Sequence, residues 1–324
     1  MRYYSIKIYD PVTNETRLEY STQFKDGSNN PRPLRVVFDI PFYNASKSAG
    51  MAYVKIYGVS YPEITQSSNF NNCLIEIRAG MAKGLPLADP NQQGIILLGK
   101  VFQAFGNWQG TEITLDLIVE PRDNSGTTPL NLTLNWNKGE TLDVSVKKAL
   151  KVAYPREGFS VEGKFDSRLI STTDQNVGTF YTVAQLGAAL ERLSKSVILD
   201  INYYGAQITQ TNEGFYLYDN SVESSSKLLS YNDFIGNATY NDYQQINFKL
   251  VMRADLTVGD YITMPKQSNI ANSRASFTQY RDNISFSNDF IINQIRHVGD
   301  SRQASADSWC SVIDAYVKTP KITQ

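Results

Sequence analysis

Histidine is nearly absent from this sequence, which limits the catalytic chemistry available to it. His297 is the single histidine among 324 residues, so a Ser-His-Asp or Cys-His site would have to use it, with Asp300 or Asp307 nearby in the sequence. A lone histidine at the end of a predicted strand is typical of packing or a turn. We expect no catalytic residue, although a glycosidase-like pair of carboxylates forms only in space and would leave no sequence signature.

Cysteine is also scarce. Cys73 and Cys310 are the only two, and zinc-type spacing of His and Cys is missing, so we expect no metal site. The pair favours an intracellular chain with two partly buried thiols, and a disulfide between them is the alternative. The start, MRYYSIKIYD, lacks the basic residues and apolar core of a signal peptide. With no apolar run near the ~20 residues of a membrane span, we expect a soluble protein made in the cytoplasm, without stable membrane insertion.

Nucleotide-binding and nucleic-acid-binding patterns are missing as well. The sequence contains no GxxxxGK[ST] motif and no GxGxxG motif between a strand and a helix, so no cofactor is expected. The 31 basic and 32 acidic residues give a net charge of −1, with no basic stripe. This balance argues against a nucleic-acid partner held by charge.

What the sequence does contain, in its first third, is alternating apolar and polar residues rich in tyrosine and phenylalanine. This alternation, with a period of two residues, is typical of half-buried strands. We expect a turn from Gly106 to Thr111 around the indole of Trp108, and a short helical turn over residues 61–67. The strands are expected at residues 2–10, 17–24, 34–40, 51–58, 72–78, 95–104 and 112–120. The pattern predicts an N-terminal β-barrel domain over residues 1–125.

The middle of the chain has helical spacing. Apolar residues recur every three or four positions over residues 142–154, with Thr141 as the predicted N-cap and Pro155 as the stop. A second helix is predicted over residues 183–197, capped by Thr182. A strand over residues 130–136 precedes the helices, and a hairpin with a glycine turn at Gly214 follows them. These elements predict an inserted α+β domain over residues 126–245.

The last part of the chain returns to strands. Val258-Gly259-Asp260 is a predicted turn into a short strand that Pro265 ends. Residues 290–298, ending at Gly299-Asp300, and residues 309–317 predict a hairpin with a long loop. We expect residues 246–324 to complete a second barrel, so the fold class is mainly β with an α+β insert: two barrel-like β domains plus a small α+β domain.

Eight residues are candidates for a structural turn or an interface. The three tryptophans favour buried anchors of the barrels, with ligand stacking as the alternative. The candidates are Gly106, Trp108, Gly259, Asp260, His297, Gly299, Asp300 and Trp309.

The order of several motifs resembles the baseplate hub proteins of contractile-tailed bacteriophages, a family related to the spike base of type VI secretion. Two stretches near the N-terminus carry the first part of the resemblance, LRVVFDI and the following MAYVKIYGVSYPEI. Together they resemble the apolar strand, the x-I-Y-N-L-S segment and the short helix that follow one another in that family. LTVGDYITMP with IRHVGDSRQASADSWCSVIDAY resembles its ending. The resemblance spans residues 34–317. Val258 stands where proline is common, and Gly58-Val59 stands where Asn-Leu is usual.

The resemblance implies a structural, non-enzymatic role. Such hubs are homotrimers with two barrel domains per subunit, so that a pseudo-sixfold ring joins the hexameric tail tube to the central spike protein. Baseplate wedge proteins and a tape-measure protein are further expected partners, with DNA only as passing cargo. The implied location is the tail baseplate of the virion, assembled in the host cytoplasm. The alternative functions are a tail-associated glycan hydrolase and a carbohydrate-binding module, which would show an exposed aromatic platform.

Overall fold

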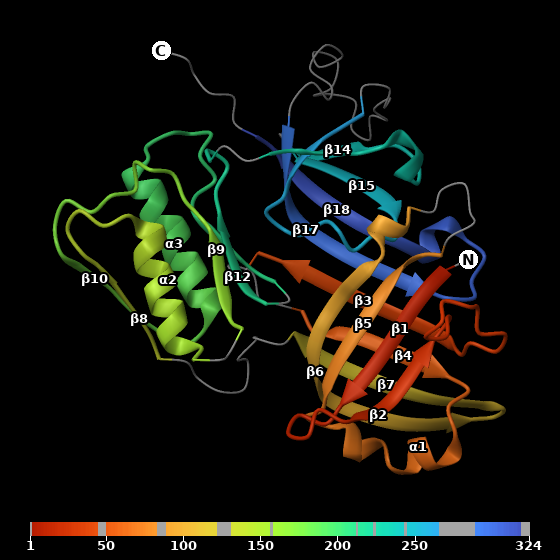
Figure 1. Ribbon diagram of the computed structural model, residues 1–324. Coiled ribbons are helices and arrows are strands. Elements are labelled where there is room, and N and C mark those ends of the chain that lie inside the picture. Colours follow the sequence, from red (N-terminus) through yellow and green to blue (C-terminus); the bar gives the residue numbers. More distant parts are fainter. Residues whose placement is uncertain are drawn as a thin grey trace.

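A computed structural model describes residues 2–44, 50–82, 89–121, 131–155, 158–211, 213–222, 225–242, 245–265 and 289–318. Most strands in this part of the chain belong to one 13-stranded sheet. Two helices and two smaller sheets form a lobe beside it (Figure 1). The predicted class, mainly β with an α+β insert, is confirmed.

The N-terminal strands curve around a common core. Their spatial order is β3-β4-β7-β6-β5-β1-β2, with antiparallel pairing throughout. The strands are β1 (Arg2–Tyr9), β2 (Thr16–Ser21), β3 (Arg35–Tyr43), β4 (Ala52–Tyr57), β5 (Leu74–Met81), β6 (Gly94–Gln109) and β7 (Glu112–Pro121). The short helices α1 (Tyr61–Thr65) and η1 (Ser67–Phe70) connect β4 to β5, and η2 (Pro90–Gln92) precedes β6.

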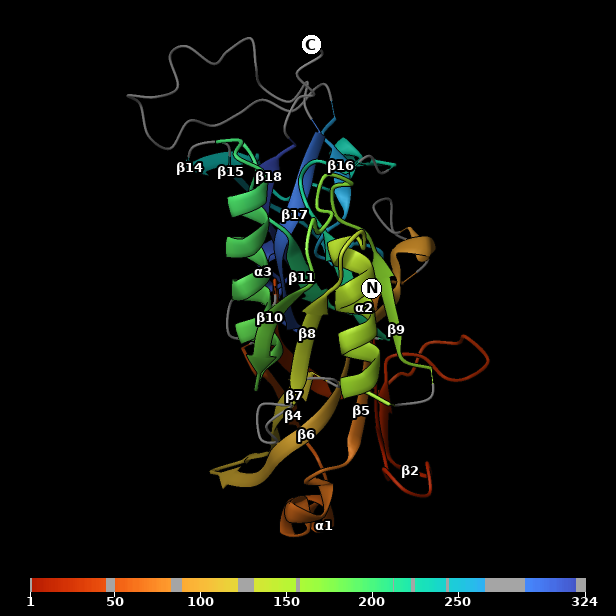
Figure 2. The same ribbon diagram turned by 90° about the vertical axis from the view of Figure 1, so that its left-hand side faces the viewer.

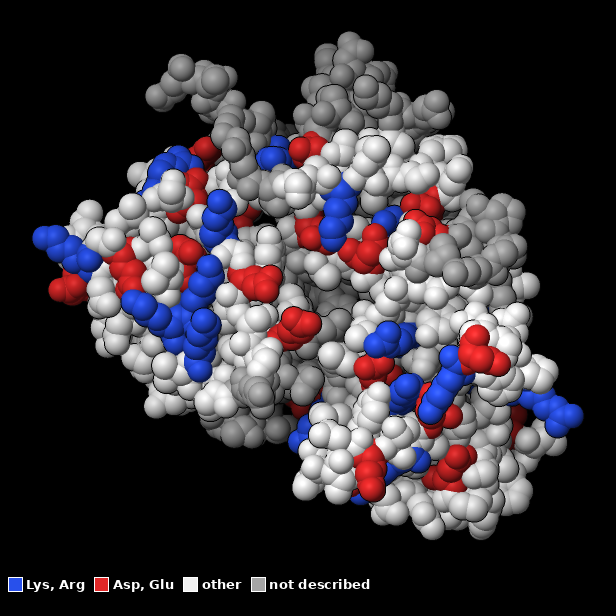
Figure 3. All heavy atoms as spheres, viewed as in Figure 1, with Lys and Arg blue, Asp and Glu red and all other residues white. Residues whose placement is uncertain are grey.

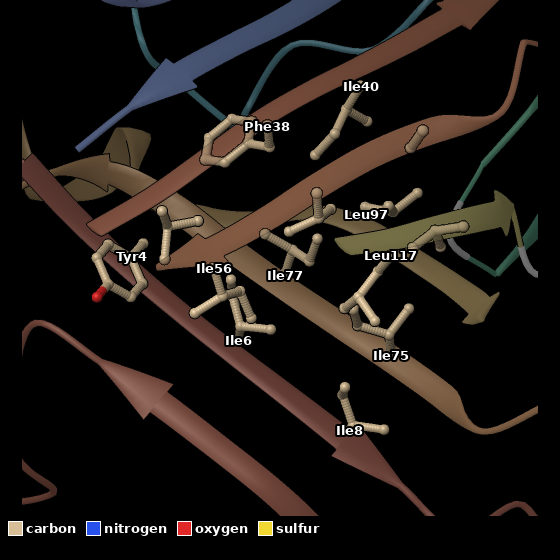
Figure 4. Close-up of a cluster of buried hydrophobic side chains, with 14 of the residues drawn as sticks. Tyr4, Ile6, Ile8, Phe38, Ile40, Ile56, Ile75, Ile77, Leu97 and Leu117 are labelled. Carbon is tan, nitrogen blue, oxygen red and sulfur yellow. The ribbon is translucent and has the colours of Figure 1, made fainter. Parts of the chain in front are cut away.

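Alternation along these strands creates the core. Successive side chains of a strand point to opposite faces, and the inward residues are aliphatic or aromatic. Figure 4 shows them pointing toward one another from six different strands: Tyr4, Ile6, Ile8, Phe38, Ile40, Ile56, Ile75, Ile77, Leu97 and Leu117. Each of these ten side chains is at most 1% exposed. The burial of these side chains stabilises the barrel-like unit.

The C-terminal strands extend the same sheet. Strand β3 pairs with β4 on one side and with β17 on the other, and the order continues β17-β18-β15-β14. The elements are β13 (Lys227–Leu228), η3 (Tyr231–Asp233), β14 (Thr239–Asp242), β15 (Gln245–Val251), β16 (Tyr261–Thr263), β17 (Asp289–Asp300), η4 (Ala306–Ser308) and β18 (Trp309–Val317). They enclose a second apolar cluster.

The α+β lobe has its own apolar cluster between two helices and two small sheets (Figures 1 and 2). Its elements are β8 (Leu132–Trp136), α2 (Leu142–Ala153), β9 (Ser160–Gly163), β10 (Gln175–Phe180), α3 (Val183–Val197), β11 (Gln207–Gln210) and β12 (Gly214–Tyr218). The predicted cap of the second helix is present, because Thr182 Oγ1 accepts a hydrogen bond from Gln185 N at 3.2 Å. Thr141 occupies the N-cap position of α2 without a side-chain capping bond.

Two local predictions need correction. Strand β6 does not turn at Gly106: it runs on to Gln109, and the chain reverses at Gly110, whose φ is +61°. Strand β17 includes Gly299 and Asp300, which were expected to form a turn.

The domain boundaries stay a prediction. The three apolar clusters draw on different parts of the chain, but the N-terminal and C-terminal strands share one sheet through β3 and β17. The predicted boundary near residue 125 lies outside the described residues, and the one near residue 245 falls at the start of β15.

Candidate functional site

Trp309 anchors the place where the β17–β18 hairpin meets the N-terminal strands. Its indole is 2% exposed, and Nε1 donates a hydrogen bond to Gly80 O at 2.9 Å. The ring meets the Phe38 ring edge-on, with 5.2 Å between centroids. The buried N–H therefore has a partner, as aromatic polar groups in cores usually do. The indole is a packing anchor, as the sequence favoured.

Gly299 makes room for the same aromatic cluster. It lies opposite Phe38 of β3 in the strand register. A Cβ at this position would lie 2.3 Å from Phe38 Cζ, which is far inside van der Waals contact. The glycine is required by the close approach of the Phe38 ring and not by a turn.

Asp300 ends β17 as an ion-pair partner. Arg35 donates to both of its carboxylate oxygens, at 3.2 and 2.7 Å, and the backbone N–H of Arg302 donates at 3.0 Å. Burial alone would raise the pKa of Asp300, but Arg35 and these backbone donors outweigh it and hold the pKa below its ordinary value. Arg2 donates to the Asp300 carbonyl oxygen, so β1 is fastened to the same point.

His297 and Asp300 do not form a catalytic pair. The two residues are three apart in one strand and therefore point to opposite faces. His297 is 3% exposed, and its Nδ1 lies 3.0 Å from Ser311 Oγ. Burial lowers the pKa of His297 to about 4, so the ring is neutral at pH 7. The Asp300 carboxylate is committed to Arg35.

Gly259 and Asp260 form the predicted turn before β16. Gly259 has φ +93°, and a Cβ there would lie 2.9 Å from the Tyr218 ring. The Asp260 carboxylate accepts from Thr257 N at 2.7 Å and from Lys227 Nζ at 2.7 Å. The turn thus rests against the α+β lobe and is closed by its own aspartate.

Trp108 lies at the far end of β6, on the surface. It is 62% exposed, and its Nε1 donates to Gly110 O at 2.9 Å. Its ring meets Tyr61 of α1 edge-on at 6.0 Å. The expected buried anchor is wrong for this tryptophan. Gly106 lets α1 lie directly on β6, because a Cβ would lie 2.3 Å from Ile64 O.

One ion network was missed by the sequence reasoning. Arg253 donates to both carboxylate oxygens of Asp255, at 2.7 and 2.6 Å, and to Asp233 at 3.0 Å. Gln92 Nε2 donates to the same Asp233 oxygen at 3.2 Å. The spacing Arg253-Asp255 alone predicts only a local pair, since Asp233 and Gln92 come from distant segments.

The described residues contain no metal site, no disulfide and no membrane-spanning helix. Within them, no group of three or more His, Cys, Asp or Glu side chains is placed to hold a metal ion. Cys73 and Cys310 are both buried and free, so the alternative of a disulfide is wrong. No helix in the described ranges has the length and hydropathy needed to cross a membrane.

Comparison with solved structures identifies the fold, whereas comparison of sequences finds no match. No family model matches the chain, and no curated protein sequence matches it. The arrangement of strand groups and lobe is nevertheless the fold of bacteriophage tail proteins and of type VI secretion spike-base proteins. The resemblance seen in the sequence is confirmed at the level of the fold.

Two solved structures carry this assignment. The 43 kDa tail protein of prophage MuSo2 from Shewanella oneidensis superposes with a TM-score of 0.52 at 7% identity, over 97% of this chain and 96% of that one. A component of the type VI secretion system from E. coli, described as structurally similar to T4 tail proteins, superposes with a TM-score of 0.50 at 11% identity. That match covers 91% of this chain and 78% of the other.

Proposed function

We propose that this chain is a structural, non-enzymatic hub subunit of a contractile tail or a related injection machine. Three copies form a ring that joins the tail tube to the central spike. The fold supports the proposal, because a tail protein matches nearly the whole length of the chain. The location that follows is the tail baseplate of a virion assembled in the host cytoplasm.

The observation that carries the proposal is the pairing of β3 with β17. Seven residue pairs, from Gln294–Tyr43 to Asp300–Val37, join the N-terminal and C-terminal strand groups into one sheet. Two barrel-like units held rigidly side by side can act as two of six similar positions. Three subunits would then match a hexameric tube on one face and a trimeric spike on the other.

Open sheet edges give a means of association. Among the described strands, β2 and β14 end the main path of the large sheet. An unpaired edge is a template for pairing with another chain, and a closed ring covers such edges. We propose that a neighbouring copy covers at least one of them.

The surface charge suits protein contacts and a passing DNA. Lysine, arginine, aspartate and glutamate are interspersed over the β strands on the face shown in Figure 3, and basic side chains gather at one place on the α+β lobe. A channel lined with basic residues would hold phosphate strongly and slow its passage. The proposed partners are the tail tube protein and the spike, with baseplate wedge proteins and a tape-measure protein nearby.

Mass in solution tests the trimer. At micromolar concentration the chain alone is expected to sediment near 109 kDa, three times the 36.4 kDa of one copy, and a mixture with the tail spike protein of the same particle should give a heavier complex that contains three copies of the chain. Electron microscopy of the parent particle should show three copies at the lower end of the tube. A chain that stays at 36.4 kDa, both alone and in the presence of the spike protein, refutes the hub proposal.

Trp108 gives a sharper version of this test. We propose that the exposed pair of Trp108 and Tyr61 contacts a neighbouring copy, since large exposed aromatic side chains are typical of interface centres. Trp108→Ala is expected to weaken the trimer by at least tenfold without changing the melting temperature of the monomer. Tyr181→Ala, on the α+β lobe and also 62% exposed, is the matched control and should leave the trimer intact. Equal effects of the two variants would remove Trp108 from the interface.

A further inference from the structure

The N-terminal and C-terminal strand groups share one plan. Strands β3 to β7 lie in the spatial order β3-β4-β7-β6-β5, and strands β14 to β18 lie in the order β14-β15-β18-β17-β16. All neighbouring pairs in both series are antiparallel. Each strand of one group therefore has a counterpart in the other: β3 corresponds to β14, and β6 corresponds to β17.

Shared irregularities show which residues correspond. The register of β6 with β7 shifts just after Val101, and the register of β17 with β18 shifts just after Ile292. The segment that leads into β5 or β16 bonds to the same place in each group: Asn72 N donates to Val101 O at 2.7 Å, and Gly259 N donates to Ile292 O at 2.8 Å. Asn72 and Gly259 both have a positive φ, +66° and +93°. Val101 and Ile292 are therefore equivalent positions.

The equivalence carries across the paired strands. From Val101 it leads to β7 and then β4, and from Ile292 it leads to β18 and then β15. The matching residues are Val119 with Ala315 and Ala52 with Ile246. One step further, Asp39 of β3 corresponds to Thr239 of β14. Counting along the two long strands makes Asn107 of β6 correspond to Val298 of β17.

The two long strands differ in their partners. Beyond the shift, β17 pairs with β3 on the side away from β18, through seven residue pairs. On the matching side, β6 pairs with β5 only as far as Lys100, and Asn71 Oδ1 then accepts from Ala104 N at 2.8 Å. None of the described strands pairs with residues 105–109 on that side. The far half of β6 is therefore an open edge at the place where β17 has a partner.

Strand β14, the counterpart of β3, is open as well, because it ends the main path of the large sheet. Figures 1 and 2 show β14 at the top of the β strands, whereas the far half of β6 lies against α1 at the bottom, with Gly106 beside Ile64. The two open edges of one chain are thus too far apart to meet. An open edge is a template for a strand of another chain. Phe105 and Trp108, on the far half of β6, are 39% and 62% exposed.

We propose that β14 of one copy pairs antiparallel with the far half of β6 in the next copy, as β3 pairs with β17 inside the chain. Asp39 faces Val298 in the pairing within the chain, so Thr239 should face Asn107 in the pairing between copies. This inference rests on the proposed ring and names its contact surfaces. Each copy supplies one junction within itself and one to its neighbour, so three copies close a ring of six similar junctions.

A disulfide between copies tests the register. In the double variant Asn107→Cys with Thr239→Cys, the two sulfurs come from facing residues. The Cα atoms of such residues are about 4.5–5.5 Å apart in an antiparallel pair, which is within the usual span of a disulfide. Cys73 and Cys310 are buried and do not compete. After mild oxidation, a non-reducing gel should show covalent dimers and trimers with little monomer left.

The control pair is out of register. Gln103→Cys with Thr239→Cys uses another exposed position of β6, four residues from Asn107 and therefore about 13 Å along the strand. This distance is too long for a disulfide. The oxidised control should run as a monomer on the gel, whereas both double variants in reduced form should keep the trimer mass in solution.

The outcomes separate this inference from the hub proposal. A reduced trimer in which the in-register pair does not cross-link, or in which both pairs cross-link equally, overturns the strand pairing and leaves the ring. Covalent products larger than the trimer support the strand pairing and overturn the closed ring. A chain that is monomeric in solution and does not cross-link overturns both.

Discussion

At the scale of single residues, the structure separates packing roles from chemical ones. His297 and Asp300 attract attention in the sequence because they are close together and of catalytic types. The structure gives each a structural partner, Ser311 for the imidazole and Arg35 for the carboxylate. Arg35 lies 265 residues from Asp300, so no local pattern could have predicted this pair. The sequence predicted either packing or a turn for His297, and the ring is buried within a strand.

The buried imidazole makes stability depend on pH. The pKa of His297 is lowered from 6.5 to about 4 by burial, so the unfolded chain takes up a proton at a higher pH than the folded chain. The contribution of the neutral ring is fully present above pH 6.5 and is lost as the pH falls toward 4. Because His297 is the only histidine, the free-energy gap between wild type and His297→Ala should shrink by roughly 2–3 kcal/mol between pH 7 and pH 4.5.

Urea unfolding of both proteins across this pH range measures the gap. The carboxylates titrate in both proteins, so their contributions cancel in the difference between the two unfolding free energies. His297→Ala should also keep the mass of the assembled wild type, since the ring is buried and touches no outer surface. A constant gap would disprove the buried neutral imidazole. A folded variant that no longer assembles would contradict the packing role.

At the scale of elements, close contacts decide where glycine is needed. Residues 309–317 were expected as a strand, and β18 has these bounds. The apolar alternation of the hairpin was strong enough to predict it. Gly106 shows the limit of such reasoning: the sequence near it looks like a turn, but the glycine serves the approach of α1. A tertiary contact of this kind has no signature in the neighbouring residues.

Gly299→Ala tests the contact between the hairpin and β3. The added Cβ would overlap the Phe38 ring, with the nearest atom at 2.3 Å, and one side of that ring is held by Trp309. Overpacking of this kind costs typically 1–3 kcal/mol, and we expect a loss at the upper end of that range. Thermal unfolding and chemical denaturation measure it. Gly299→Val should prevent folding or assembly.

A second substitution shows whether the ring is the cause. Phe38→Leu shortens the side chain that faces Gly299, so the double variant with Gly299→Ala should lose less stability than the sum of the two single variants. A coupling of at least about 1 kcal/mol is expected for residues in direct contact. Simple additivity would mean that Gly299 is required for another reason.

At the scale of the whole molecule, the sequence predicted the kinds of elements but not their neighbours. The class of fold followed from alternation in the first and last thirds and helical spacing in the middle. The position of β3 between β4 and β17 did not, because β3 and β17 are more than 240 residues apart. Strand order depends on which apolar faces meet in space, and one period-two pattern pairs equally well with several others.

The network around Arg253 ties the two strand groups together from another side. Arg253 and Asp255 follow β15, Asp233 lies in η3, and Gln92 lies just before β6 in the N-terminal group. Ala254 N also donates to Gln92 O at 2.8 Å. The Arg253 side chain is 7% exposed, so its carboxylate partners depend on it for neutralisation.

Arg253→Met is therefore expected to cost about 3–5 kcal/mol, the usual result of breaking a buried ion pair from one side. Calorimetry should also show the single transition of the β body separating into two, because Asp233, to which both Arg253 and Gln92 donate, is left as an unneutralised carboxylate between the two strand groups. Arg296→Met is the matched control. Arg296 of β17 also donates to an aspartate, Asp39 of β3, but the Arg296 side chain is 50% exposed. Such a pair contributes about 0–1 kcal/mol and less at high salt. If the two variants lose equal stability and both keep one transition, the Arg253 network does not hold the strand groups together, and the β3–β17 pairing alone does.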